Sequence, residues 1–355
     1  MRVSSALRAF ASPFLAASPS LPPHLNPRHH PVVYSPGYSP ASWPEKHAFP
    51  MSKFADTFKH LSERRVPSLQ GPLILDPGHV FSPVPAPPAD LLSPPHDADY
   101  VERFLSSSLS PSEAATIGFK GDLISQVVPR TLAEISGTCL ALSLALEFGL
   151  SSSVAGGTHH AFPGRGSGYT VLNDLAVAAH WAIKDPAVPA ERVLVVDLDV
   201  HQGDGTAAFS RLPQLRGRLL TLSLHGADNF PLRKEESTWD VPLPTGAGDE
   251  EYMAALKPAL ERAVEEGRPD AVLYDAGVDA LGEDRLGKLS LTPGGLRERD
   301  RHVIGYVVGR GIPCACVVGG GYNRDLGRLA EMHSIVHYEA ARVWRERKMY
   351  KRSSS

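Results

Sequence analysis

The residues best suited to chemistry follow one apolar stretch of the chain. The run Val195–Gly205, VVDLDVHQGDG, supplies the carboxylates Asp197, Asp199 and Asp204 and the imidazole of His201. An extended strand sends alternate side chains to one face, so Asp197, Asp199 and His201 would lie together. Carboxylate oxygens and imidazole nitrogens are ligands for zinc and similar dications. An aspartate before a glycine-rich turn also caps helices, but the Asp-x-Asp-x-His spacing favours a metal site.

Three further loops carry chemically useful residues directly after short apolar stretches. They read GGTHH at 156–160, DAGVD at 275–279 and GGGY at 319–322. The adjacent His159 and His160 follow two glycines that allow close backbone approach, which favours a site over a structural role. Asp279, taken alone, is also typical of a turn. The glycines before Tyr322 do not favour a phosphate-binding loop, because no Gly-Lys-Ser or Gly-Lys-Thr follows them.

These loops together offer a catalytic metal centre. Asp199, His201 and Asp279 are three candidate ligands, which leaves coordination open for water and substrate. Attack of water on a carbonyl then needs a base, an acid for the leaving amine and a group that stabilises the oxyanion. The polar residues of these chemical types that remain are His159, His160, Tyr322, Asp197 and Asp204. The set indicates hydrolysis of an amide.

Strand-like and helix-like segments alternate around these loops. We expect strands at 32–34, 152–155, 193–196, 219–224, 271–274 and 314–318, and helices at 51–65, 131–148, 171–183, 204–212, 250–266 and 296–310. A further strand-like segment, Leu73–Leu75, interrupts a proline-rich connection over 66–96. Such alternation is typical of an α/β fold with a parallel sheet, in which ligands bind at the carboxyl ends of the strands.

The bulk composition excludes several classes of protein. The 355 residues are 42% hydrophobic, enough for one large globular domain or two small ones. With a net charge of -3, the chain has no excess of basic residues, so direct nucleic-acid binding is not expected. The three cysteines form no paired motif, which argues against a disulfide framework and against a cysteine zinc site.

The N-terminal segment has the composition of an organellar transit peptide. The first 44 residues contain no Asp, Glu or Lys and are rich in Ser, Ala and Pro. We expect residues 1–31 to be a disordered transit peptide and favour the chloroplast over the mitochondrion; a plain disordered tail of a cytoplasmic or nuclear protein is the alternative. The apolar stretch Ala9–Ala17 is broken by Pro13, so we expect no membrane span.

The ordered series of motifs resembles one enzyme family. The motifs are GGTHHA at 156–161, GSGYTVLND at 166–174, VVDLDVHQGDG at 195–205, LSLHG at 222–226, AGVD at 276–279 and GGGY at 319–322. The chain is similar to zinc-dependent histone deacetylases over residues 32–345, which we expect to be the catalytic domain, followed by a polar tail over 346–355. The phrase GEDRLG at 282–287, with Phe49–Pro50, is most similar to class IV deacetylases and their bacterial relatives.

The resemblance implies a fold and a role for each candidate residue. The fold would be a single arginase-deacetylase domain, with an eight-stranded parallel sheet flanked by helices. Zinc would be bound by Asp199, His201 and Asp279. His160 would act as general base and then acid, with His159 as its electrostatic partner. Asp197 would orient His159, Asp204 would orient His160, and Tyr322 would polarise the acetyl carbonyl.

The same resemblance implies a second ion and a substrate tunnel. A structural potassium ion would be held around Asp197, Asp199, His201, Ser223 and Leu224. Gly168 and Tyr169 would line the acyl tunnel, with Phe230 on its opposite wall. Tyr169 stands where the family usually has Phe, and Asp275 is an acid where the family often has a neutral residue.

Several functions remain open at this stage. Zinc-dependent removal of acetyl from acetyl-lysine in proteins is the first, and a small N-acetylated amine, such as an aromatic acetamide, is the alternative substrate. A two-manganese ureohydrolase would need an Asp-x-Asp pair that the 275–279 loop lacks. A non-catalytic module that binds acetylated ligands is the third hypothesis. The sequence does not indicate an oligomeric state.

Overall fold

One parallel sheet organises the computed structural model, which describes residues 14–16, 26–63, 77–188 and 190–350. Its eight strands are β1 (Val32–Val33), β2 (Val80–Phe81), β3 (Leu150–Ser153), β4 (Val193–Asp197), β5 (Leu219–Gly226), β6 (Trp239–Leu243), β7 (Ala271–Asp275) and β8 (Cys314–Val317). They lie in the order β2-β1-β3-β8-β7-β4-β5-β6, and every neighbouring pair is parallel. The predicted α/β fold with an eight-stranded parallel sheet is confirmed.

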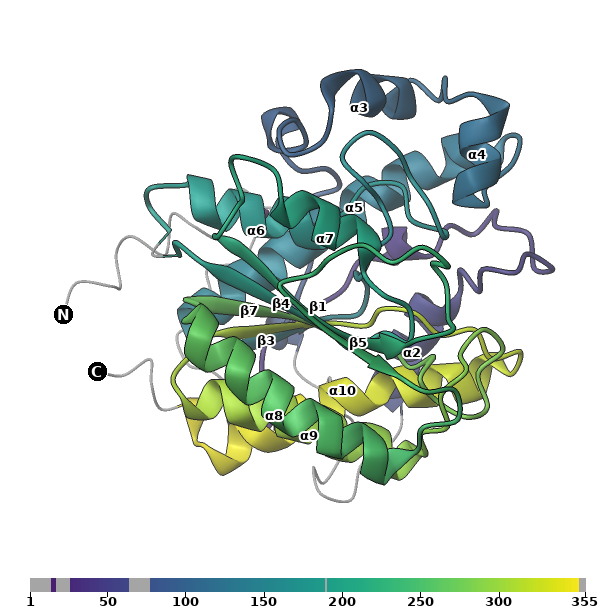
Figure 1. Ribbon diagram of the computed structural model, residues 1–355. Helices are drawn as coiled ribbons and strands as arrows, with labels where there is room; N and C mark the ends of the chain where they lie inside the picture. Colours follow the sequence, from purple (N-terminus) through teal and green to yellow (C-terminus); the bar gives the residue numbers. More distant parts are fainter. Residues whose placement is uncertain (1–13, 17–25, 64–76, 189, 351–355) are drawn as a thin grey trace.

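Helices cover both faces of the sheet, so the central strands are buried. The helices are α2 (Lys53–Glu63), α3 (Ala98–Leu105), α4 (Pro111–Ile117), α5 (Leu123–Phe148), α6 (Asp174–Lys184), α7 (Asp204–Ser210), α8 (Asp249–Gly267), α9 (Pro293–Gly309) and α10 (Leu326–Glu346). In Figure 1, α5, α6 and α7 lie above the sheet, and α8, α9 and α10 lie below it. Every residue of β4, β7 and β8 is buried, as expected for strands covered on both faces.

The sequence placed the central strands well and the flanking elements less well. The strands expected at 193–196, 219–224, 271–274 and 314–318 coincide with β4, β5, β7 and β8 within two residues. The strand expected at 152–155 instead spans Leu150–Ser153, and Leu73–Leu75 lies outside the described residues. The strands β2 and β6 and the helices α3, α4 and α10 were not expected.

The helix α5 begins eight residues before its expected start at 131 and contains Pro129. Proline removes one helical hydrogen bond, but Ile124 and Val127 in this added stretch are buried in the core, and their burial favours the longer helix.

Among the described helices, α5 alone is long and apolar enough to match a membrane span. Of that apolar stretch, 83% is buried within the domain, as in a core helix.

The packed part of the chain extends beyond the expected boundaries of 32 and 345. The Phe14 ring lies 4.8 Å from that of Trp181, edge on. His30 Nε2 is 2.7 Å from Ser152 Oγ, and Trp344 Nε1 donates to the carbonyl of Asn26 at 3.0 Å. Met349, near the other end, is 1% exposed. Most of the expected transit peptide lies outside the described residues, so the transit peptide and its target organelle stay predictions.

A buried arginine joins the loops that leave the ends of two neighbouring strands. Arg299 of α9 donates to the carbonyl oxygens of Leu198 at 3.1 Å and Gly277 at 2.7 Å. Its Nε donates to Asp300 Oδ1 at 2.8 Å, and the side chain is fully buried. A single guanidinium therefore fixes the loop after β4 relative to the loop after β7.

We expect Arg299→Met to lower the free energy of unfolding by about 3–5 kcal/mol, because it leaves the buried Asp300 carboxylate without its counter-charge and the carbonyl oxygens without this donor. Arg301→Met is the matched control: its side chain is 48% exposed, and the change should stay within about 0.5 kcal/mol. Urea unfolding measures both variants. Equal stability of the two would contradict the role of Arg299.

Candidate metal centre and active site

The three expected metal ligands converge at the ends of β4 and β7. His201 Nδ1 lies 2.9 Å from Asp199 Oδ1 and 3.1 Å from Asp279 Oδ2. All three side chains are buried, and one ligand atom from each lies within 4.8 Å of the other two. Two oxygens and one nitrogen thus face a common point.

This donor set fits a zinc ion. Two donors bound tetrahedrally at zinc distances lie about 3.3 Å apart, which is close to the separations between His201 and the two carboxylates. Backbone groups hold those carboxylates in place: Gly320 N donates to Asp199 Oδ2 at 2.7 Å, and Val200 N donates to Asp279 Oδ1 at 2.9 Å. Three protein ligands leave a position open, as in catalytic zinc sites.

The adjacent imidazoles each pair with a different carboxylate, as the resemblance implied. His159 Nδ1 is 2.8 Å from Asp197 Oδ2, and His160 Nδ1 is 2.6 Å from Asp204 Oδ1. These pairs leave Nε2 of each ring for other contacts. The loop that carries both histidines is fixed by Asp174 at the start of α6, which accepts from Gly157 N and Thr158 N.

The two imidazoles have opposite electrostatic surroundings. Burial and the neighbouring His159 lower the pKa of His160 to about 4, even though Asp204 opposes the shift. Burial also disfavours the charged form of His159, but the carboxylates of Asp197 and Asp199 outweigh it and raise the pKa of His159 well above its usual value. His160 is therefore neutral at pH 7 and able to accept a proton.

Asp275 is fully buried beside the histidine pair. It lies opposite Asp197 in the register of β4 and β7, and its Oδ2 is 3.8 Å from His159 Nδ1. Neither carboxylate oxygen has a hydrogen-bond partner among the described residues. Burial and the charge of Asp197 raise the pKa of Asp275 well above its usual value.

His159, Asp197 and Asp275 form a second group with ligand-like spacing. In this group His159 Nδ1 already lies at hydrogen-bond distance from Asp197 Oδ2. Its separation of 3.8 Å from Asp275 Oδ2, by contrast, exceeds the about 3.3 Å expected between two donors on one zinc ion. The group is thus better described as a paired imidazole with an additional carboxylate than as a second metal centre.

Two of the three expected tunnel residues line the same cavity. Gly168 and Tyr169 line it together with His160 and Tyr322. Gly168 has a φ of +53°, and a Cβ there would lie 2.6 Å from His160 Cδ2, so only glycine fits. Phe230 does not line the cavity, but its ring lies 4.9 Å from that of His160, edge on, and is 44% exposed.

Asp284 holds the loop that carries Tyr322, although the motif analysis assigned it no role. Its Oδ2 accepts from Tyr322 N at 2.7 Å, and its Oδ1 accepts from Leu286 N at 2.8 Å. Burial and the nearby carboxylates of Asp199 and Asp279 raise the pKa of the Tyr322 phenol well above its usual value. The phenol therefore stays protonated and available as a hydrogen-bond donor.

Three further charged side chains that line the cavity are buried, and no sequence pattern indicated them. Lys53 Nζ donates to the carbonyl of Gly319 at 2.9 Å, and Arg130 Nη2 donates to Glu134 Oε1 at 2.6 Å. Burial lowers the pKa of Lys53 to about 8, so the ammonium is charged at neutral pH. The cavity has a volume of ≈ 30 Å³, room for about one water molecule.

The residues expected around potassium lie on adjoining strands. Asp197 of β4 is opposite Ser223 of β5, and Leu224 follows in β5. All five expected residues are buried. The bound ion stays a prediction.

Comparisons with known proteins agree on one family. Residues 47–336 match the histone deacetylase domain. An uncharacterized protein of Picosynechococcus sp. is 42% identical over 315 residues, which cover 88% of this chain and 99% of that protein. Histone deacetylase 2 of Arabidopsis thaliana is 29% identical over 257 residues, which cover 70% of this chain and 65% of that protein.

A solved structure supports the fold. The crystal structure of an HDAC homolog from Aquifex aeolicus superimposes with a TM-score of 0.69 at 22% sequence identity. The superposition covers 88% of this chain and 84% of that one. At this identity the likeness bears on the fold alone.

We expect Asp199→Ala and His201→Ala each to reduce bound zinc from one ion per chain to nearly none, because two donors remain. Asp204→Asn is the matched control; it alters a buried acid that is not a ligand and should retain the ion. Zinc analysis after equilibrium dialysis measures all three. Full occupancy in either ligand variant would refute the assigned centre.

Proposed function

Since the chain belongs to the histone deacetylase family and is a deacetylase hydrolase, we propose that it uses one zinc ion to remove acetyl from acetyl-lysine in proteins. One observation carries the proposal: His160, Tyr322 and Asp199 line one cavity, and His201 and Asp279 form the ligand group with Asp199. These groups come from the loops that follow β3, β4, β7 and β8. The arrangement supplies every role that amide hydrolysis requires.

His160 performs the proton transfers. Zinc, when bound, would polarise the acetyl carbonyl and lower the pKa of a water molecule. His160 is neutral at pH 7, so its Nε2 accepts the proton that this water loses. Asp204 stabilises the resulting imidazolium, which then donates the proton to the leaving amine of lysine.

Tyr322 and His159 stabilise the charge that develops during the attack. The Tyr322 phenol donates a hydrogen bond to the carbonyl oxygen, where negative charge accumulates in the transition state. His159, kept positive by Asp197, adds a fixed positive charge beside the reacting atoms. Neither group needs to move, which lowers the cost of reorganisation.

The charged lining favours a short acyl group. A longer chain would have to pass the Lys53 ammonium and the Arg130–Glu134 pair in a cavity of ≈ 30 Å³. Methylene groups of a longer acyl chain, packed against these charged side chains, would displace the polar partners of the charges, which costs free energy. Acetyl is therefore a better substrate than hexanoyl.

A small N-acetylated amine is the alternative substrate, and the residues around the tunnel support the protein substrate more strongly. Two apolar side chains near the site are exposed: Phe230, whose ring lies 4.9 Å from that of His160, is 44% exposed, and Leu326, which lines a hollow together with Tyr322, is 40% exposed. A small acetamide would leave such residues uncovered, whereas a peptide chain would cover them.

We expect His160→Ala to lower kcat for an acetyl-lysine peptide by about 10²–10⁴-fold while retaining zinc, because the base is lost and the ligands are intact. Tyr322→Phe should lower kcat by about 10²-fold through loss of the oxyanion donor. Release of acetate, measured on acetyl-lysine peptides, hexanoyl-lysine peptides and small acetamides, provides the test.

The control is His302→Ala, a histidine of α9 outside the centre, which should retain native kcat. A native chain that binds acetylated peptides and releases no more acetate than His160→Ala would make the protein a binding module and reject the proposal. Faster turnover of small acetamides than of peptides would reject only the protein substrate.

A further inference from the structure

A second hollow opens directly beside the active-site cavity. It has a volume of ≈ 680 Å³ and shares Phe49 and Tyr322 with the cavity that contains the histidine pair. Its walls come from residues 39–52 and from the loops that hold Arg285 and Arg324. A substrate that inserts its acetyl-lysine beside Tyr322 would place its neighbouring residues here.

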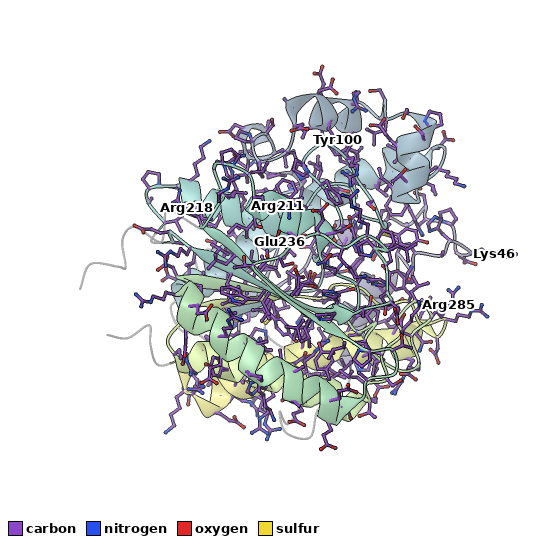
Figure 2. The ribbon with its side chains drawn as sticks, in the orientation of Figure 1. Lys46, Tyr100, Arg211, Arg218, Glu236 and Arg285 are labelled. Atoms are coloured by element: carbon purple, nitrogen blue, oxygen red, sulfur yellow. The ribbon has the colours of Figure 1, made fainter. Side chains whose placement is uncertain are left out.

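Three exposed cations face this hollow. They are Lys46, Arg285 and Arg324. Within the described part of the chain, none of them makes an ion pair or a side-chain hydrogen bond, whereas nearby Arg328 is paired with Glu283 at 2.8 Å. Figure 2 shows Lys46 and Arg285 on the same side of the molecule, both directed outward.

The hollow is positively charged overall. Glu45 is the one acidic side chain in its lining, against the three cations. A concave surface with an excess of one charge concentrates ligands of the opposite charge. Its ligand should therefore be anionic.

The rest of the lining indicates a peptide and not a small inorganic anion. Trp43, Pro40, Pro44 and Leu326 add apolar surface between the cations. A free phosphate or carboxylate would use only the charges, while a peptide segment would cover both kinds of surface. The hollow also adjoins the site where the proposed substrate is held.

From this surface we infer that the protein prefers acetyl-lysine flanked by acidic residues, and that Lys46, Arg285 and Arg324 bind the acidic flank. The inference rests on the proposed deacetylation of proteins and names its substrate class. A lysine-rich segment would meet like charges here, which is unfavourable for binding. Exposed ion pairs are individually weak, so the three cations act together.

The test compares three acetyl-lysine peptides that differ only in their flanks: glutamate, glutamine or lysine on both sides. We expect kcat/KM to fall in that order, with about a tenfold difference between the glutamate and lysine peptides at low ionic strength. The difference should shrink as salt is added, because exposed charges are screened. It should shrink to less than twofold in the triple variant K46Q/R285Q/R324Q.

A triple variant with the same change in net charge serves as the control. K257Q/R262Q/R301Q removes three exposed cations from α8 and α9, and it should keep the native preference. Loss of the preference in this control would assign the effect to net charge and overturn the inference.

The remaining outcomes separate the two proposals. Equal kcat/KM for all three peptides would overturn the inference and leave deacetylation intact, while no turnover of any peptide would reject both. Tripolyphosphate provides a free-anion probe. If it binds the hollow and the enzyme does not discriminate among the peptides, the cations serve a separate anionic ligand and the inference fails.

Discussion

Four carboxylates buried at the ends of two neighbouring strands are the constraint on which the structure depends. Asp197, Asp199, Asp275 and Asp279 are at most 2% exposed, and they lie within a few residues of one another on β4 and β7. Like charges in a water-poor interior repel strongly and lose hydration. Such a group is stable only if positive charge or protons balance it. The imidazolium of His159 and the ammonium of Lys53 supply part of that balance, and the proposed zinc ion would supply the rest.

The fold places these groups by topology and backbone contacts. The strands β3, β8, β7 and β4 are consecutive neighbours in a parallel sheet, so the loops at their carboxyl ends meet at one edge. Arg299 joins two of those loops from below the sheet, and Asp174 and Asp284 fix the other two. Each of these side chains is bonded to backbone groups and not to the ligands. The positions of the ligands are therefore set by the loops that carry them.

Much of the centre could be predicted because its residues follow strands within a few positions. The spacing of Asp197, Asp199 and His201 pointed to a metal site, although β4 ends at Asp197 and the two ligands lie in the loop beyond it, not on one face of a strand. The motifs implied the carboxylate partner of each histidine. Lys53, Arg130 and Arg299 could not be predicted in this way. They lie on helices far along the chain from the ligands, and a single cation in a helix gives no sign that it will be buried. Asp275 was noticed as unusual, but only packing shows that it is buried.

The edges of the fold were harder to predict for a related reason. The central strands are apolar runs that bury both faces, whereas β6 alternates and includes a proline. The helix expected from 131 begins instead at Leu123, and core packing carries α5 through Pro129. Local sequence decided the elements at the centre, and tertiary packing decided those at the periphery.

The most direct test of this account compares the free energy of unfolding of the native chain and Asp279→Asn, with a chelator and with zinc. Burial raises the pKa of Asp279 to about 7. A carboxyl with a raised pKa destabilises the fold once ionised, and at pH 8 this penalty is present in full. The account predicts that Asp279→Asn is the more stable chain in chelator. Zinc at 100 times its Kd should stabilise the native chain by about 2.7 kcal/mol and the variant by much less, which reduces the advantage of Asp279→Asn. A native chain that is more stable in chelator, or that gains nothing from zinc, would contradict the account.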